Sequence, residues 1–566
     1  MPYRPYPPPL PLAAFRALIE ELPADHLARL VEQVVEAVII PPPRPPRKGN
    51  LPYDPRVSVK VLVYGYATGT RSSRQMQRLC RENRAYLFLT RGQTPCYHTL
   101  CTARVEEKEP LEAVWVALFA VAERLGLKRV GHVVIDSTKL RADARPEAVL
   151  TRAEFAPLLA EWERILAVAQ EVDAREDAEG YPGETRLPET ADPTQMRDLV
   201  RAVRRQLGRS RPGKRAAGPP APEGEAAGKR RGKQPPRRAA APGDPPPAPP
   251  EAGPASGAPP RPATGPARAT GNAAFAAPAR LTRQMLQRIA LAVKALGIAL
   301  AEGWDYLCLT DPDARMMAEG RDKKIRECHS FEVAVDHGLL VVGQTCQEGN
   351  DNARLEPIVA AAQAHEPAGV KQATADSGFF SGDAVGRLIR AGVDTCIPDS
   401  NTAADLHQGK PIGTHTAQKR GKVELVYDAE ANLLRCPEGN ELRPSQQREH
   451  GGQAVTVYRA RRSCAGCPRA PECLTQPEAK HRTVKVGAYH AELRQAQERF
   501  AAPEHQERYR HRGEAVETVF GFVRGTLGYD RWWLRGSERV ACEGRLLKVA
   551  YQIRKVQVAW AAGAGR

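Results

Sequence analysis

Hydrophobic and polar positions alternate at helical spacing through the first quarter of the chain. Apolar residues recur every three or four positions in residues 24–38, which predicts one amphipathic helix. The same period across residues 51–107 predicts three short helices whose exposed positions are rich in Arg. Ser and Thr stand before the second and third of these, where they are good caps. The three helices resemble a helix-turn-helix unit, and a further helix is expected at residues 111–125.

A different pattern begins near residue 130, where short apolar runs alternate with helical segments. A strand is predicted at residues 130–136, and a β-hairpin at 328–346, around the turn residues Asp-His-Gly. A short strand leading to Asp376, a helix at 382–391 and another strand at 393–398 follow. This succession predicts a mixed α/β sheet flanked by helices.

Composition changes sharply at two places. Residues 208–280 are almost entirely Pro, Ala, Gly and Arg, so they cannot bury enough apolar surface to offset their ordering entropy, and we expect them to be disordered. The expected segments are a Pro-rich arm with one helix (1–50), a helical DNA-binding domain (51–125), the start of the α/β domain with a helical insertion (126–207), a disordered linker (208–280), the main α/β core (281–420), a Cys-rich insertion (421–485) and a C-terminal helical part (486–566).

The charge favours a polyanionic partner. The formal net charge of the 566 residues is +17, and the segment 208–272, with 12 Lys and Arg against 4 Asp and Glu, accounts for only part of it. No run of eighteen apolar residues occurs, and the N-terminus lacks the pattern of a signal peptide, so we expect a cytoplasmic protein that does not bind membranes. The twelve cysteines are then expected to be thiols or metal ligands.

Three carboxylates are candidates for a metal site. Asp136 and Asp376 each end a predicted strand, and parallel strands place such side chains in one crevice, although either Asp alone is also typical of a turn. Glu517 lies at the edge of the apolar stripe of a predicted helix, and Arg524, seven residues on, lies on the same face. Two Asp and one Glu can hold two hard divalent cations, which promote phosphodiester cleavage and strand transfer.

The sequence resembles the bacterial insertion-sequence transposases that have a DDE catalytic domain of the RNase H-like fold. The segment "LPYDPRVSVKVLVYGYATGTRSSRQMQRLCREN" resembles their N-terminal helical domain, and "VIDSTKLRADA", "TDPDARMM", "NDNARLEPIV", "ADSGFFS" and "VETVFGFVRGTLGYDRWWLRG" resemble the catalytic blocks. The resemblance implies that Asp136, Asp376 and Glu517 bind two Mg²⁺ or Mn²⁺ ions. It also implies a homodimer that acts on terminal inverted repeats and target DNA at the bacterial nucleoid.

Basic and aromatic residues near these blocks are candidate DNA contacts. Lys139, Arg512 and Arg524 are expected to bind phosphates, although the spacing of Arg512 from the glutamate and the Arg in place of a Lys at 524 depart from the family pattern. Arg531 and Trp532 could bind phosphates and stack on unpaired bases, or Trp532 could close a core turn. Two further acids in "LTDPDARMM", at positions 311 and 313, could join the metal site, but a turn is the preferred interpretation.

Four cysteines have the spacing of a zinc site. Cys436 is followed by Cys464, Cys467 and Cys473, and the pair in "CAGC" is typical of a zinc knuckle. We expect a small zinc-ribbon-like insertion, with scattered reduced thiols as the alternative.

The function that these patterns favour is a DDE transposase that cleaves and joins DNA strands of an insertion sequence. Two alternatives stay open at this point. One is a catalytically decayed transposase that only binds DNA, and the other is an RNase H-like nuclease that cuts without joining.

Overall fold

The fold is described from a computed structural model in which the described residues are 11–38, 52–178, 197–198, 200–205, 283–320, 324–412, 423, 425–428, 431–450, 453–476 and 478–564. The chain divides into two compact units, one of Met1–Val149 with Cys308–Arg566 and one of Leu150–Leu307. The expected linker at 208–280 and much of the expected arm lie outside the described residues.

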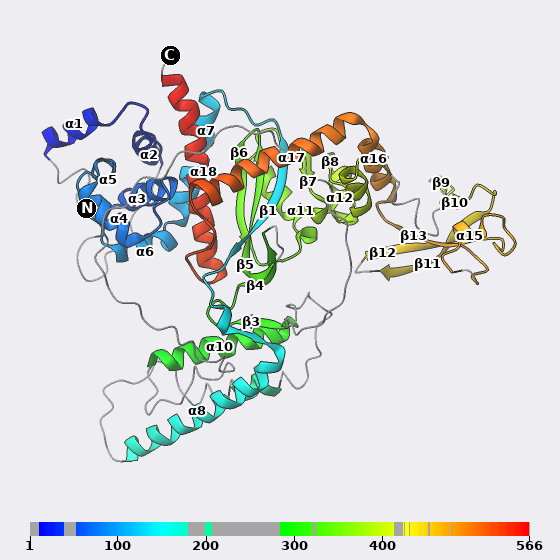
Figure 1. The fold of residues 1–566 in the computed structure, drawn as a ribbon, viewed down its shortest axis with the longest axis horizontal. Helices are drawn as coiled ribbons and strands as arrows, with labels where there is room; N and C mark the ends of the chain where they lie inside the picture. The colour runs from blue at the N-terminus through cyan, green and yellow to red at the C-terminus, as the bar shows by residue number, and fades with distance from the viewer. Residues whose placement is uncertain are drawn as a thin grey trace, which may run out of the picture. The chain divides into compact units, whose positions relative to one another are not determined.

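The N-terminal part of the first unit is all helical (Figure 1). Its helices are α1 (Leu12–Glu21), α2 (Leu27–Glu36), α3 (Pro55–Ala67), α4 (Ser73–Glu82), α5 (Arg84–Thr90), α6 (Tyr97–Glu106) and α7 (Lys108–Arg124). Two of the boundaries differ from expectation. The arm contains a second helix, α1, and the middle one of the three expected helices is divided at Asn83, whose extended backbone ends α4 while its side chain caps α5.

Helix α3 is the centre of this helical part. Every residue from Val57 to Ala67 is buried, including Lys60, whose ammonium group lies between the carboxylates of Glu32 and Glu36 on α2 at 2.6 and 2.5 Å. A buried lysine requires such partners, because the ammonium group loses its hydration. The C-terminal helix α18 (Ser537–Ala564) packs along α3 and α7, and so joins the helical part to the sheet.

The α/β part is a six-stranded mixed sheet. Its strands are β1 (His132–Arg141), β4 (Arg315–Glu319), β5 (Lys324–Asp336), β6 (Leu339–Cys346), β7 (Gln372–Ala375) and β8 (Asp394–Cys396). The order is β4-β5-β1-β7-β8, with β6 also on β5. Strand β1 runs antiparallel to β5 and parallel to β7, which is parallel to β8. The hairpin of β5 and β6 turns at His337 and Gly338, whose φ angles of 46° and 80° suit a two-residue hairpin loop.

Strand β1 is longer than the sequence pattern predicted. The expected strand ended at Asp136, but β1 continues to Arg141, because its antiparallel partner β5 extends to the pair Arg141 and Cys328. Pairing with β7 stops earlier, at Ile135 and Ala375. Asp136 therefore lies inside β1 but at the point where the parallel side of the sheet ends.

Helices cover both faces of this sheet (Figure 1). One face carries α11 (Leu355–Gln363) and α12 (Gly382–Arg390), whose apolar side chains form a core with Val133 and Ile135 of β1. The other face, with Val134 and Leu140, belongs to the core that includes α18 and α17 (Pro503–Gly521). Since side chains alternate along a strand, Asp136 faces the same side as Val134, toward α17.

The first unit also contains several shorter helical elements. They are η1 (Pro146–Ala148), η4 (Asp351–Ala353), η5 (Ser377–Phe379), α13 (Ser400–His407), α16 (His490–Ala501) and the π-helix η6 (Phe522–Thr526).

The Cys-rich insertion forms a second, antiparallel sheet. Its strands are β9 (Val426–Asp428), β10 (Leu433–Arg435), β11 (Glu441–His450), β12 (Gln453–Ala460) and β13 (Thr483–Gly487), in the order β13-β12-β11-β10-β9. The insertion also contains the short helix α15 (Ala470–Cys473).

The second unit contains two long helices, α8 (Arg152–Ala178) and α10 (Arg283–Ala301), together with helical residues 200–205. Its buried side chains include Phe155, Trp162 and Leu296. The strands β2 (Val149–Thr151) and β3 (Tyr306–Cys308) pair where the chain enters and leaves it. Within the described part of the chain, none of the helices has the length and apolar character needed to cross a membrane.

Candidate active site

Two of the predicted carboxylates lie side by side at the end of the parallel strands. Ile135 of β1 pairs directly with Ala375 of β7, so the next residues, Asp136 and Asp376, stand at the same level on neighbouring strands. Neighbouring strands are about 4.8 Å apart. Asp376 begins the short helix η5 and accepts a hydrogen bond from the Gly378 N–H at 2.9 Å, which fixes its carboxylate.

The electrostatics of Asp136 report this closeness. Burial, followed by the charge of Asp376, raises the pKa of Asp136 from 3.8 to about 6. The N–H of Ser137 and the guanidinium of Arg512 act in the opposite direction, and the charge of Asp351 raises the pKa further. Carboxylates that repel one another in a half-buried site are a suitable place for a divalent cation, because the cation relieves the repulsion.

Glu517 is not part of this pair in the structure. It lies on α17, a helix that packs against β1, β7 and β8, and its side chain is exposed. Its carboxylate extends back along the helix, so that a Cβ at Gly513 would lie 3.7 Å from Oε1. In the part of the chain that the structure describes, no three His, Cys, Asp or Glu side chains form a group that could hold a metal ion.

Arg512 is the residue of α17 that reaches the carboxylate pair. Its Nη1 lies 3.4 Å from Asp136 Oδ2, and its guanidinium lies over the ring of Tyr509, 5.1 Å from the centroid. Arg512 is three positions after Tyr509, so both occupy one side of the helix. The contact partly neutralises Asp136 and joins α17 to β1.

Lys139 is held by an acid that the sequence pattern did not indicate. Its Nζ lies 2.7 Å from Asp351 Oδ1 and donates to Ser137 Oγ and Ser330 Oγ at 3.0 and 2.9 Å. The Ser137 hydroxyl donates to the other oxygen of Asp351 at 3.0 Å. Asp351 lies in η4, outside any strand, where the only signal was its place in the block "NDNARLEPIV".

Arg524 and Arg531 hold the second half of β1. Arg524, in the π-helix, donates to Thr138 Oγ1 at 3.0 Å and to the Lys139 carbonyl at 2.7 Å. Arg531 pairs with Asp143. A π-helix inserts one residue into the helical period and occurs often at functional sites.

Trp532 lies in the core. It is 0% exposed, its Nε1 donates to the His329 carbonyl at 3.3 Å, and its backbone N–H donates to the Arg141 carbonyl. Of the two interpretations of Trp532, the structure therefore supports the core turn, because a base cannot stack on a fully buried ring.

Asp311 and Asp313 both contact the start of α18. Asp313 accepts hydrogen bonds from the N–H and hydroxyl of Ser537 at 2.7 and 2.8 Å. Asp311, fully buried, accepts from the Gly536 N–H at 3.0 Å and pairs with His329. Both acids therefore secure a turn to a helix N-terminus, where negative charge is stabilising.

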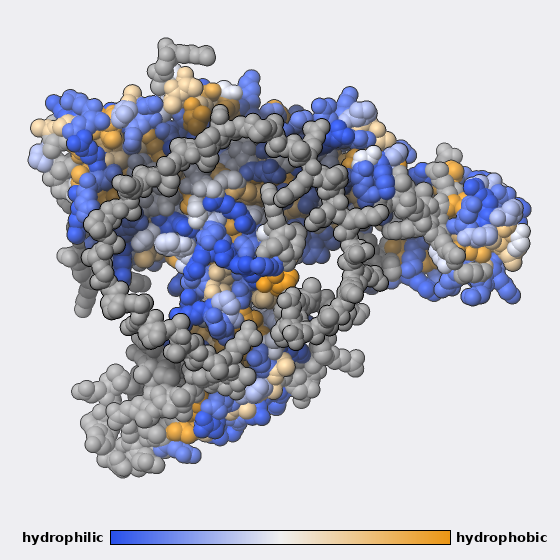
Figure 2. All heavy atoms as spheres, viewed as in Figure 1, coloured by the Kyte–Doolittle hydropathy of each residue, from blue (hydrophilic) through white to orange (hydrophobic). Residues whose placement is uncertain are grey.

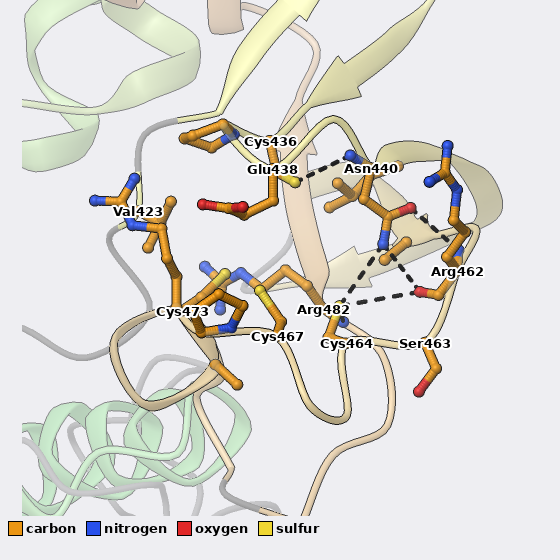
Figure 3. Close-up of a pocket in the computed structure, with 16 residues that line it drawn as sticks. Val423, Cys436, Glu438, Asn440, Arg462, Ser463, Cys464, Cys467, Cys473 and Arg482 are labelled. Atoms are coloured by element: carbon orange, nitrogen blue, oxygen red, sulfur yellow. Dashed lines mark hydrogen bonds between the residues drawn. The ribbon is translucent and has the colours of Figure 1, made fainter.

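The four predicted zinc ligands line one pocket of the Cys-rich insertion. Cys436, Cys464, Cys467 and Cys473 surround a cavity of about 210 Å³ (Figure 3). The N–H of Asn440 donates to Cys436 Sγ at 3.2 Å, and that of Arg482 to Cys464 Sγ at 3.4 Å. Burial raises the pKa of the Cys473 thiol, and the other three thiols add to the rise. Four thiols and supporting N–H donors fit zinc by their chemistry, although the sulfurs are not gathered into a metal site here.

Two family models match the chain. One is described as "Transposase domain (DUF772)" and matches residues 16–106, which contain the second half of α1 and all of α2 to α6. The other is described as "Transposase DDE domain" and matches residues 435–557, which contain the four cysteines and Glu517. Searches of curated proteins and of solved structures gave no match.

Both matches indicate a DNA transposase. Together, in this order along the chain, they support an insertion-sequence transposase with a DDE domain. Domains of this kind generally use divalent metal ions. The first two acids of the predicted triad, Asp136 and Asp376, precede the matched DDE segment and follow the matched helical one.

Proposed function

We propose that this chain is the enzyme that cleaves and joins the DNA strands of an insertion sequence, with Asp136, Asp376 and Glu517 as its metal ligands. The observation that carries the proposal is the pair Asp136 and Asp376, level with each other at the end of parallel strands, with the pKa of Asp136 raised to about 6. The mixed sheet with helices on both faces supports the expected RNase H-like fold.

Mg²⁺ or Mn²⁺ ions fit the two aspartates, because hard cations prefer carboxylate oxygens. When bound, such ions would activate the attacking water or 3′-hydroxyl and stabilise the leaving oxygen. Glu517 is exposed on α17, five residues after the Arg512 that contacts Asp136, and is the proposed third ligand.

The chain's other residues would position this site and the DNA. Arg512 orients the Asp136 carboxylate, and Arg524 holds the Thr138 hydroxyl and the Lys139 carbonyl, two and three residues further on. The ammonium group of Lys139 lies beside Asp351, and a DNA phosphate would compete with Asp351 for this group. The helical N-terminal part is the proposed reader of the element ends, with a dimer bringing the two ends together in the bacterial cytoplasm.

The proposal is tested with DNA that contains the inverted repeats flanking the reading frame. Purified protein with Mg²⁺ or Mn²⁺ should nick these ends and join them to a target. Asp136→Asn, Asp376→Asn and Glu517→Gln should each abolish both products and leave DNA binding close to wild type. Glu514→Gln is the matched control, since Glu514 lies on the same helix, is exposed and pairs only with His511 among the contacts described.

The outcomes separate the alternatives. Cleavage retained by Glu517→Gln and lost by Glu514→Gln would move the third ligand to Glu514. Cleaved ends without joined products would identify a nuclease. Specific binding without cleavage in either metal would identify a decayed copy that acts only as a DNA-binding protein.

A further inference from the structure

One face of the sheet in the Cys-rich insertion is apolar, and the other carries exposed cations around two buried valines, Val455 and Val457. The apolar face carries the small core of the insertion, which contains Leu434, Leu442, Tyr458, Ala460 and Val486. Side chains alternate along each strand, so the residues between these positions project from the opposite face. In Figure 2 hydrophilic side chains cover most of the visible surface of the insertion.

The opposite face gathers exposed cations from three strands. We call it the basic face and define it by Arg443, Arg448, Arg459, Arg461 and Lys485, all of which are exposed. Pairing places Arg443 of β11 directly opposite Arg459 of β12, and Val457 of β12 opposite Lys485 of β13. Arg461 follows the end of β12, and its N–H bonds to the Glu441 carbonyl. The five cations therefore project from one face of the sheet, on which Val455 and Val457 of β12 are buried between them.

The pairing of Arg443 with Arg459 is the informative feature. Like charges directly opposite each other on neighbouring strands destabilise a sheet. Two acids lie on this face: Glu441 contacts Arg443 at 3.0 Å and Arg435 at 3.6 Å, and Asp428 contacts Arg435 at 3.4 Å. They stand against Arg435 and the five cations of the basic face, so a surplus of positive charge is left. An anionic partner would relieve the repulsion that the fold leaves in place.

We propose that the basic face binds the phosphate backbone of a DNA duplex. The inference rests on the proposed function in its choice of DNA as the polyanion, and the surface itself follows from the register and the charges. Arg side chains present planar donors to phosphate oxygens, and Arg459 and Arg461 lie two positions apart at the end of β12. Contacts of Arg and Lys with backbone phosphates position a protein on DNA and carry no sequence information.

The contacts should appear in the salt dependence of DNA binding. Each phosphate contact contributes about −0.9 to the slope of log K against log salt concentration. The double variant Arg459→Gln/Arg461→Gln removes two contacts, so its slope should be less steep by about 2, and its affinity at about 0.1 M salt should fall by up to about 60-fold. The measurement is fluorescence anisotropy of a labelled duplex with the full-length protein in EDTA, between about 50 and 200 mM salt.

Two further variants make the result specific. Arg387→Gln/Arg390→Gln on α12 removes the same charge from exposed arginines that pair with Glu356 and Glu492, and should leave slope and affinity unchanged. Glu441→Gln removes the acid that holds Arg443, and should strengthen binding, which misfolding cannot imitate.

Equal slopes for the wild type and the Arg459→Gln/Arg461→Gln variant would overturn the inference. An equal loss in the α12 control would overturn it as well, because the effect would then come from net charge. A single-stranded RNA of the same length is tested in parallel. If the Arg459→Gln/Arg461→Gln variant lost affinity for this RNA and kept its affinity for the duplex, DNA would be rejected as the partner. None of these results depends on strand cleavage, so failure here and failure of the proposed catalytic triad are separate observations.

Discussion

Replacement of Asp136 by Asn should stabilise the metal-free protein while it removes the proposed metal ligand. In the folded chain the pKa of Asp136 is about 6, against 3.8 in its ordinary state. Ionising this half-buried carboxylate beside Asp376 therefore costs folding free energy. At about 1.4 kcal/mol per pKa unit, the cost is ~3 kcal/mol at high pH, and Asn avoids it.

The sign and the pH window follow from the same pair of pKa values. Below pH 3.8 the carboxyl is protonated in both states and costs nothing. As pH rises from 3.8 through 6, the unfolded chain releases its proton first, so the wild type loses stability relative to the Asn variant. The difference should be about 1 kcal/mol at pH 4.5 and reach ~3 kcal/mol near pH 8.

Thermal unfolding in EDTA at these two pH values measures the difference. For a unit of this size ~3 kcal/mol corresponds to a rise in melting temperature of several degrees. Mg²⁺ should then raise the melting temperature of the wild type and leave that of Asp136→Asn unchanged, since a ligand stabilises only the state that binds it. A variant that is no more stable than the wild type at pH 8, or a gain that does not change with pH, would refute the repulsion between the two aspartates.

Three other substitutions test separate parts of the fold. Cys467→Ser should lose the bound zinc and lower the melting temperature, whereas Cys101→Ser, at an exposed site elsewhere, should keep one zinc per chain; equal zinc content in both, measured by mass spectrometry, would contradict the proposed zinc site. Trp532→Phe removes the hydrogen bond to His329 and should cost about 1–3 kcal/mol without changing DNA affinity, whereas weaker DNA binding by a protein that melts like the wild type would favour base stacking. Gly131→Ala should destabilise by more than about 1 kcal/mol, because φ is +79° and the new Cβ would lie 2.5 Å from the Gly369 carbonyl; an unchanged denaturation midpoint would contradict this backbone.

Local patterns predicted the elements of the sheet well where the signal was local. The run Asp336-His337-Gly338 marked the hairpin, because Asp and Gly favour turns and Gly adopts the positive φ of a two-residue hairpin loop without strain. The adjacency of Asp136 and Asp376 was also expected, since strand ends in a parallel pair share one edge. The extension of β1 to Arg141 was not expected. Residues 136–141 are mostly polar and show no clear alternation, and they form a strand because they pair with β5.

The contacts of the site depend on residues far apart in sequence, and these the pattern could not supply. Lys139 was expected to bind phosphate, but its partner Asp351 lies 212 positions away in a short helical turn with no periodicity. Glu517 was placed correctly on a helix, yet the direction of its side chain depends on how α17 packs on the sheet. Trp532 had the same sequence signal for stacking and for burial, and only tertiary packing distinguishes them.

The arginines near the proposed active site share an arrangement that bears on how the protein holds DNA. Asp143 pairs with Arg531 and Arg535, and Asp394 with Arg499 and Arg508. Each acid thus fixes two guanidinium groups while neutralising only one charge. The surplus charge stays available, and side chains that are already ordered lose little entropy when a phosphate arrives. Replacing Asp143 or Asp394 by Asn removes the neutralising charge, so DNA binding should become stronger, as is expected for Glu441→Gln on the basic face.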